Sequence, residues 1–303
     1  MKKKILIIGG TGFLGSHLSK ELCTKYSITS ISLKKKITKK INGVEYKNLD
    51  ITKKKQFKFL DRKSFDIVIN FGGYVDHNNK TLNLKTQYIA VKNIVEYFKN
   101  KNLECLIQIG SCAEYGSVDS PHLENFHCKP KMAYGKAKLK ATKYLKSLTE
   151  HKKIPIIILR LYQIYGPKQS NNRFIPILIN KCLENKKFLC HTKGIYRDFL
   201  YIDDFIKLLK KIIVSKKKKK CFGKIFNVGF GKPINLKLIS EKIKKLSGGG
   251  HQSSKVVKLR IDENKVIYPN IELIKTFFNW YPKIKFDTGL KKTINYYRIN
   301  KLP

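Results

Sequence analysis

The chain of 303 residues is 42% hydrophobic, which is enough for a large core, and no run of about 18 apolar residues could span a membrane. Its formal net charge of +43 comes from 64 basic residues against 21 acidic ones, yet only six of the basic residues are Arg. Lysine is scattered through nearly every segment without interleaved aromatic residues. The charge therefore indicates a solvated surface and excludes a specific nucleic-acid site.

The cysteines and the N-terminus bear on the compartment. The seven cysteines are an odd number without a CxxC pair, which predicts reduced thiols and no metal site. Lysines followed by apolar residues at the N-terminus imitate a secretory signal, but glycines interrupt the apolar stretch after Ile8. We therefore expect the first core strand of a cytoplasmic protein, with no membrane attachment.

The first half of the chain alternates between strand-like and helix-like patterns. The strand-like runs lie at residues 4–8, 28–33, 67–71, 106–109 and 156–161, and helical patterns lie between them, for example at 82–98 and 133–148. This alternation predicts βαβ units and a doubly wound parallel sheet of the Rossmann type, with helices on both faces. Ligands of such sheets bind at the carboxyl ends of the strands.

The second half is less regular. Helices are predicted at residues 174–184, 203–215 and 236–246, and short strands at 225–228 and 256–259. We expect two interleaved lobes: a dinucleotide-binding lobe over residues 1–165 and a smaller C-terminal substrate-binding lobe over 166–303.

A glycine turn follows the first predicted strand. Gly9 and Gly12 allow the backbone to turn tightly and approach a ligand, while Gly15 allows close packing of helix and strand. The helix that begins around Phe13 and Leu14 offers unpaired N–H groups to an anion. Strand, glycine turn and helix in this order predict a site for the pyrophosphate of a dinucleotide.

A tyrosine and a lysine lie four residues apart near the start of a predicted helix. At this spacing Tyr134 and Lys138 share one helix face, so the ammonium can favour the phenolate and help the tyrosine to exchange a proton. Ser111 ends the strand-like run 106–109 in a short loop and could hydrogen-bond the reacting oxygen. Together these side chains predict proton transfer to or from an alcohol or ketone.

With these motifs the sequence resembles the extended short-chain dehydrogenase/reductases, the NAD-dependent epimerase/dehydratase group that acts on nucleotide sugars. The resemblance runs over nearly the whole chain. It rests on the glycine turn, on Ser111, Tyr134 and Lys138, and on several shorter matches. These are Asp50-Ile51, Phe71-Gly72-Gly73, Asn83, residues 160–169 (RLYQIYGPKQ), 173–176 (RFIP), 197–204 (RDFLYIDD) and 226–229 (FNVG).

The resemblance implies roles for individual residues. It makes Ser111, Tyr134 and Lys138 the catalytic residues. It implies a nicotinamide cofactor held by Gly9, Gly12, Phe13, Leu14, Gly15, Lys34, Asp50, Ile51, Phe71, Gly72, Gly73, Asn83, Tyr134 and Lys138. A nucleotide sugar would be bound by Gln163, Arg173, Arg197 and Arg260. Pairing of two subunits is a further expectation from the resemblance, as is a role in polysaccharide biosynthesis.

Arginine is rare enough here to be informative. Four of the six arginines, at 160, 173, 197 and 260, fall in or beside these motifs. A guanidinium can bind a diphosphate with two parallel hydrogen bonds, which an ammonium cannot. We expect Arg197 and Arg260 to hold the diphosphate, and Arg160 to brace a strand end. A structural carboxylate partner is the alternative for each arginine.

Two departures from the family pattern refine the function. The family's dehydratases carry Asp-Glu directly after the catalytic residue, where this chain has Cys112-Ala113, which argues against a 4,6-dehydratase. NAD-dependent members carry an acid after the second strand, where this chain has Leu33 followed by Lys34. A missing acid and an adjacent ammonium suit a 2′-phosphate, so NADP(H) is favoured over NAD(H).

The sequence therefore predicts an NADPH-dependent reductase that transfers hydride to C4 of a 4-keto nucleotide sugar. The alternative is a nucleotide-sugar 4-epimerase that uses the same residues with retained NAD. A third class is a non-catalytic protein that binds sugar nucleotides or RNA, against which the presence of all three catalytic residues argues.

Overall fold

The structure is a computed structural model that describes residues 2–75, 79–150, 154–191, 194–257, 259, 261 and 263–300. The chain forms two compact units. The first holds the residues up to Gly116 together with Phe126–Leu161 and Leu209–Phe226, and the second holds Ser117–Asn125, Tyr162–Leu208 and the residues from Asn227 onward. Two segments thus cross the division at residue 165 that the sequence suggested.

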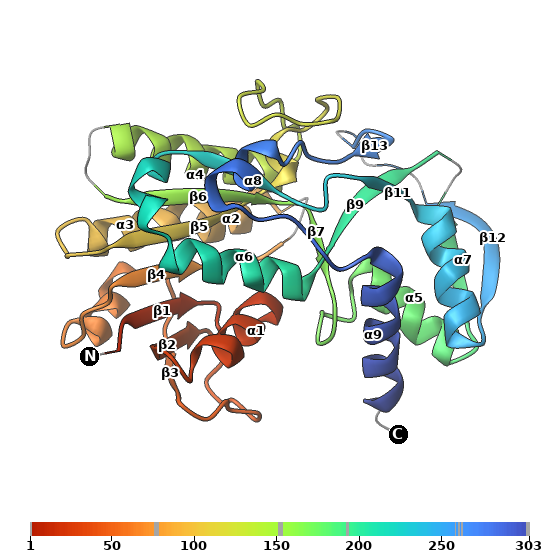
Figure 1. The fold of residues 1–303 in the computed structure, drawn as a ribbon, viewed down its shortest axis with the longest axis horizontal. Coiled ribbons are helices and arrows are strands. Elements are labelled where there is room, and N and C mark those ends of the chain that lie inside the picture. Colours follow the sequence, from red (N-terminus) through yellow and green to blue (C-terminus); the bar gives the residue numbers. More distant parts are fainter. Residues whose placement is uncertain are drawn as a thin grey trace. The chain divides into compact units, whose positions relative to one another are not determined.

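A seven-stranded sheet dominates the first unit, in the order β10-β6-β5-β4-β1-β2-β3 (Figure 1). Its strands are β1 (Lys4–Ile8), β2 (Ser27–Ser32), β3 (Val44–Asn48), β4 (Ile67–Asn70), β5 (Cys105–Ser111), β6 (Ile156–Leu161) and β10 (Ile225–Val228). From β3 to β6 every neighbouring pair is parallel. This order, with a crossover on each side of β1, confirms the predicted Rossmann-type fold.

Helices alternate with the strands of this sheet, as the alternating apolar patterns of the sequence predicted. The longer ones are α1 (Phe13–Leu22), α3 (Ala90–Phe98), α4 (Ala133–Glu150) and α6 (Ile202–Val214), whose last residues belong to this unit. A four-residue helix, α2 (Lys80–Asn83), and a π-helical segment, η2 (Leu84–Ile89), lead directly into α3. Short 3-10 segments are η1 (Lys54–Leu60), η3 (Cys112–Glu114) and η4 (Lys216–Cys221).

One face of this sheet is buried beneath α3 and α4. Alternate residues of the strands, such as Leu6, Val68 and Leu106, pack with Ile94 of α3 and Leu145 of α4 in one hydrophobic cluster. All five side chains are buried. Side chains of neighbouring strand residues point to opposite faces, so this packing fixes the register of the sheet and with it the places where the strands end.

The second unit contains smaller sheets and its own helices. Strand β9 (Tyr196–Tyr201) pairs with β7 (Gln163–Tyr165), β11 (Pro233–Asn235) and β13 (Val266–Ile267), and β8 (Lys187–His191) pairs with β12 (His251–Val257). The helices are α5 (Phe174–Leu183), α7 (Leu236–Ser247), α8 (Glu272–Phe278) and α9 (Phe286–Ile299). Within the described parts of the chain, no helix is both long and apolar enough to cross a membrane.

Candidate functional site

The glycine turn has the geometry that a bound pyrophosphate requires. Gly9 has a φ of +75°, and its carbonyl accepts a hydrogen bond from the N–H of Gly12 at 3.0 Å. A Cβ on Gly15 would lie 2.5 Å from the Gly9 oxygen, so only glycine fits there. Helix α1 begins at Phe13 without a side-chain cap on its N-cap residue Gly12. Its first N–H groups are thus left for a ligand, and the turn fits the phosphates of a dinucleotide.

Other expected cofactor residues lie at the ends of neighbouring strands. Phe71, Gly72 and Gly73 follow β4, and Asp50 and Ile51 follow β3. A Cβ on Gly72 would lie 2.8 Å from the Cδ1 of Ile51, so these two segments are in close contact.

The side chains of the expected cofactor residues differ in their hydrogen bonds and in their exposure to solvent. One oxygen of Asp50 accepts hydrogen bonds from the N–H and hydroxyl of Thr52, at 2.9 and 2.7 Å. Asn83 is buried at the end of α2. Leu33 and Lys34 follow β2 and are exposed.

The three predicted catalytic residues come from two elements of the first unit. Ser111 is the last residue of β5, and Tyr134 and Lys138 lie in the first turns of α4. The Lys138 ammonium lies 6.0 Å from the centroid of the Tyr134 ring and donates a 2.8 Å hydrogen bond to the carbonyl of Ile109, also on β5. That hydrogen bond ties the tyrosine-bearing helix to the strand that ends in the serine.

Burial changes the acid–base behaviour of this group. Lys138 and Tyr134 are only 6% and 8% exposed. Burial lowers the pKa of Lys138 to about 8, while the charge of Glu114 acts in the opposite direction. A lysine with this pKa is still mostly protonated at neutral pH, and it can change its charge in a mildly basic solution.

Glu114, which the sequence motifs did not single out, is the last residue of η3, three residues after Ser111. One of its oxygens accepts the N–H of Ser111 at 2.9 Å, and the other accepts the Nε–H of Arg160 at 2.8 Å. Arg160 on β6 thus braces the strand end through a carboxylate. The signal available in the sequence was the spacing of Ser111 and Glu114, which is that of a capping box, and the structure forms that box.

The residues expected to bind the nucleotide sugar belong to the second unit. Gln163 begins β7, and its buried Oε1 has no hydrogen-bond partner among the described residues. Arg173 is the exposed N-cap residue of α5. Arg197 on β9 is buried, and it binds the carbonyls of Tyr196 and Lys265 at 2.7 and 2.9 Å and the carboxylate of Glu263 at 2.8 Å. Arg260 lies outside the described residues.

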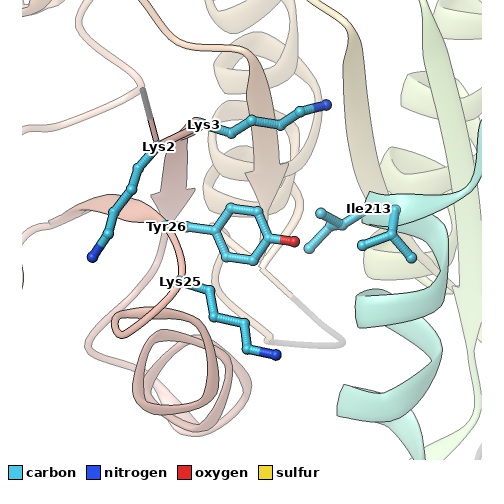
Figure 2. A pocket seen from close by; sticks show the side chains of 6 residues that line it. Lys2, Lys3, Lys25, Tyr26 and Ile213 are labelled. Atoms are coloured by element: carbon cyan, nitrogen blue, oxygen red, sulfur yellow. The ribbon is translucent and has the colours of Figure 1, made fainter.

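A pocket of about 750 Å³ lies in the first unit (Figure 2). It is lined by Lys2, Lys3, Lys25, Tyr26, Ile213 and Val214, and Figure 2 shows the Tyr26 ring directed toward Ile213. Four of its lining residues directly precede β1 or β2, whereas the glycine turn follows β1, so the pocket is at the opposite edge of the sheet. Since ligands of this fold bind at the carboxyl edge, we assign the pocket no part in the site.

Comparison with known proteins agrees with the fold and the motifs. The dTDP-D-glucose 4,6-dehydratase of Dictyostelium discoideum is 29% identical over 274 residues, which are 81% of this chain and 62% of that protein. The CDP-abequose synthase of Salmonella muenchen is 30% identical over 97% of this chain and 98% of its own length.

Among solved structures, the UDP-glucuronic acid 4-epimerase of Bacillus cereus in complex with UDP-glucuronic acid and NAD has a TM-score of 0.85. It is 24% identical and covers 98% of this chain and 99% of its own. The family model described as "NAD dependent epimerase/dehydratase family" matches residues 5–229. The chain therefore belongs to the NAD-dependent epimerase/dehydratase family, an extended short-chain dehydrogenase/reductase, as its motifs predicted.

Proposed function

We propose that this protein transfers hydride at C4 of the hexose in a nucleotide sugar, and that its reaction is the NADPH-dependent reduction of a 4-keto sugar. The observation that carries the proposal is that Lys138, one turn from Tyr134 on α4, is hydrogen-bonded to β5, the strand that ends in Ser111, within the same unit as the glycine turn. A nicotinamide dinucleotide would supply the hydride when bound.

The protein's own side chains would supply the proton that the C4 oxygen takes up when the ketone is reduced. Tyr134 would donate its phenolic proton to the C4 oxygen, and the Ser111 hydroxyl would hydrogen-bond the same oxygen and polarise the carbonyl. Lys138, held near Tyr134 by the Ile109 carbonyl, would favour the phenolate that remains. Burial lowers the pKa of Lys138 to about 8, so the side chain is still mostly protonated at neutral pH and can stabilise the phenolate by its charge.

Elimination of water is a poor fit to the same loop. Neither Cys112 nor Ala113 can act as a carboxylic acid or its conjugate base. The nearby carboxylate, Glu114, is fully buried and is already bound to the Ser111 N–H and to Arg160. A group committed to two donors in this way is not free to shuttle a proton, which supports a reductase or an epimerase over a dehydratase.

The proposed preference for NADPH rests on the segment after β2. The first exposed side chains there are Leu33 and Lys34, and neither can accept a hydrogen bond from a ribose 2′-hydroxyl. An ammonium at that position favours a 2′-phosphate. The 4-epimerase is the second candidate, and it is supported by relatives and neighbours named as epimerases, one of them a complex with NAD.

The substrate-binding role of Gln163, Arg173, Arg197 and Arg260 is part of the same proposal. It is supported by the buried Oε1 of Gln163, because a buried acceptor without a partner is costly unless a ligand satisfies it. The proposed division of labour gives the dinucleotide to residues 1–165 and the nucleotide sugar to residues 166–303. We further propose a homodimer in the cytoplasm.

The first experiment is to release and identify any cofactor of the purified protein, and to titrate the protein with NADPH and NADH. Protein that is purified empty and prefers NADPH would then be given 4-keto-6-deoxy sugars linked to dTDP, CDP, GDP or UDP, and a reductase would oxidise one NADPH for each sugar reduced. Tightly retained NAD together with interconversion of C4 epimers would establish the epimerase instead. Failure to bind either dinucleotide would overturn the whole proposal.

A further inference from the structure

The carboxylate of Glu114 is buried in the loop that follows β5. Its side chain is 0% exposed. The loop is built around it: a Cβ on Gly110 would lie 2.6 Å from the carboxylate, so Gly110 leaves the space that Glu114 occupies. A buried carboxylate is costly without donors and cations around it, which makes its surroundings informative.

Arg160 is the first cation that faces this carboxylate. Its Nε donates at 2.8 Å, and its guanidinium lies 4.7 Å from the centroid of the Tyr115 ring. Burial lowers the pKa of Arg160, but the charge of Glu114 together with smaller effects of Tyr115 and Cys128 outweighs burial, so the pKa is raised. Arg160 is therefore a permanent cation on one side of Glu114.

Lys138 is the second cation. It is packed against β5 by its hydrogen bond to Ile109, one residue before Gly110, and Glu114 acts on it through space. Glu114 thus contacts Arg160 directly, and it packs on Gly110, the residue next to the one whose carbonyl binds the Lys138 ammonium. Of the described residues, the ionisable groups that face Lys138 are Tyr134 on its own helix and Glu114 on η3, with Arg160 of β6 behind Glu114.

We propose that Glu114 is a positioning residue of the catalytic group, holding the backbone at Ser111 and supplying the negative charge that the buried Lys138 ammonium faces. The importance of this role for catalysis rests on the proposed function. The electrostatic pairing itself does not, and it can be measured without any ligand.

A double-mutant cycle with Glu114→Gln and Lys138→Met tests the pairing by urea unfolding of the full chain. Glutamine keeps the shape of the side chain but removes its charge. At pH 6.5 Lys138 is protonated, so we expect Glu114→Gln to change the unfolding equilibrium constant about tenfold more in the wild-type background than in the Lys138→Met background. At pH 10 Lys138 is neutral, and we expect this difference to vanish.

The sign and the pH window follow from the pKa of about 8 for Lys138. An attraction between Glu114 and the ammonium is fully present below that pKa and is lost as the pH rises through it. A coupling that is the same at both pH values, or absent at pH 6.5, would overturn the proposal.

Asp204→Asn provides the matched control. Asp204 is also a buried carboxylate that accepts two backbone N–H groups, from Lys283 and Ile284, but it belongs to the second unit. We expect Asp204→Asn to destabilise the protein without any pH-dependent coupling to Lys138→Met. Equal coupling in the control would mean that the effect is general and not a property of Glu114.

Discussion

At the scale of single residues, charge and hydrogen bonding distinguish the two sets of candidate side chains. Lys138 donates one hydrogen bond to a strand carbonyl and is close to the Tyr134 ring, so its environment suits a group that acts on the tyrosine. Arg197 instead binds two carbonyls and Glu263. A diphosphate that binds Arg197 would have to share it with these partners or displace Glu263.

Tyr134→Phe tests the proton donor. Because phenylalanine keeps the ring and loses only the hydroxyl, we expect turnover to fall by roughly 10²-fold or more, with little change in dinucleotide affinity. Tyr144→Phe on the same helix is the control and should keep full turnover. Steady-state kinetics and fluorescence titration of the reduced dinucleotide measure both quantities. Unchanged turnover in Tyr134→Phe would remove the tyrosine from the mechanism.

Substitutions of Arg197 and Glu263 are expected to change the KM for the nucleotide sugar in opposite directions. Arg197→Ala should raise the KM for the nucleotide sugar by about 10- to 100-fold, the effect of losing a charge-assisted hydrogen bond of ~1.5–3 kcal/mol. Glu263→Gln should lower that KM, because it removes the anion that competes for the guanidinium. If both variants keep the wild-type KM, Arg197 has a purely structural role.

At the scale of elements, apolar periodicity was a good guide to the buried strands of the seven-stranded sheet, but it missed the equally buried β9 of the second unit. β1 and β6 begin and end where the sequence predicted, and β2, β4 and β5 differ by one or two residues. β3 was missed because its side chains are only half-buried at the sheet edge and it has no apolar run. The short strands β7, β11 and β13 were missed because partners distant in sequence define them.

The residues of the candidate site were predictable from the sequence where they lie at the end of a strand or the start of a helix. The glycine turn, Ser111 and the pair on α4 all fall at such boundaries, which periodicity locates. The pairing of Glu114 with Arg160 and of Glu263 with Arg197 was not predictable in this way, because these partners lie on strands far away along the chain. Pairings of that kind depend on tertiary packing and have no local signature.

Gly15→Ala tests the packing of α1 against the glycine turn. The added methyl group would meet the backbone of Gly9 and Gly10 at 2.5 and 2.6 Å, and neither can move without opening the turn. We expect a loss of about 1–3 kcal/mol in unfolding free energy and at least tenfold weaker dinucleotide binding. Ser16→Ala, in the same helix turn, should change binding far less. Wild-type binding by Gly15→Ala would show that the turn does not hold the cofactor.

At the scale of the whole molecule, the net charge of +43 must weaken the folded state through self-repulsion. Exposed charges more than about 10 Å apart are largely screened at 0.1 M salt. We therefore expect the unfolding free energy to rise when NaCl is raised from about 0.05 to 0.5 M, as measured by urea unfolding.

Lys219 and Lys220 are both exposed in η4. The variant with Lys219→Glu and Lys220→Glu should have a higher unfolding free energy than the wild-type protein at low salt, and added salt should raise that free energy by less. A stability that falls with salt in the wild-type protein would mean that attractive ion pairs dominate over repulsion.

The interleaving of the two units has a consequence for how the protein is made. The seven-stranded sheet takes its edge strand β10 from residues 225–228, which are synthesised after Ser117–Asn125 and Tyr162–Leu208 of the second unit. A growing chain on the ribosome thus exposes the unpaired edge of β6 until Val228 has emerged. That edge can recruit another strand, so premature termination before Val228 should yield aggregation-prone fragments and no functional half-protein.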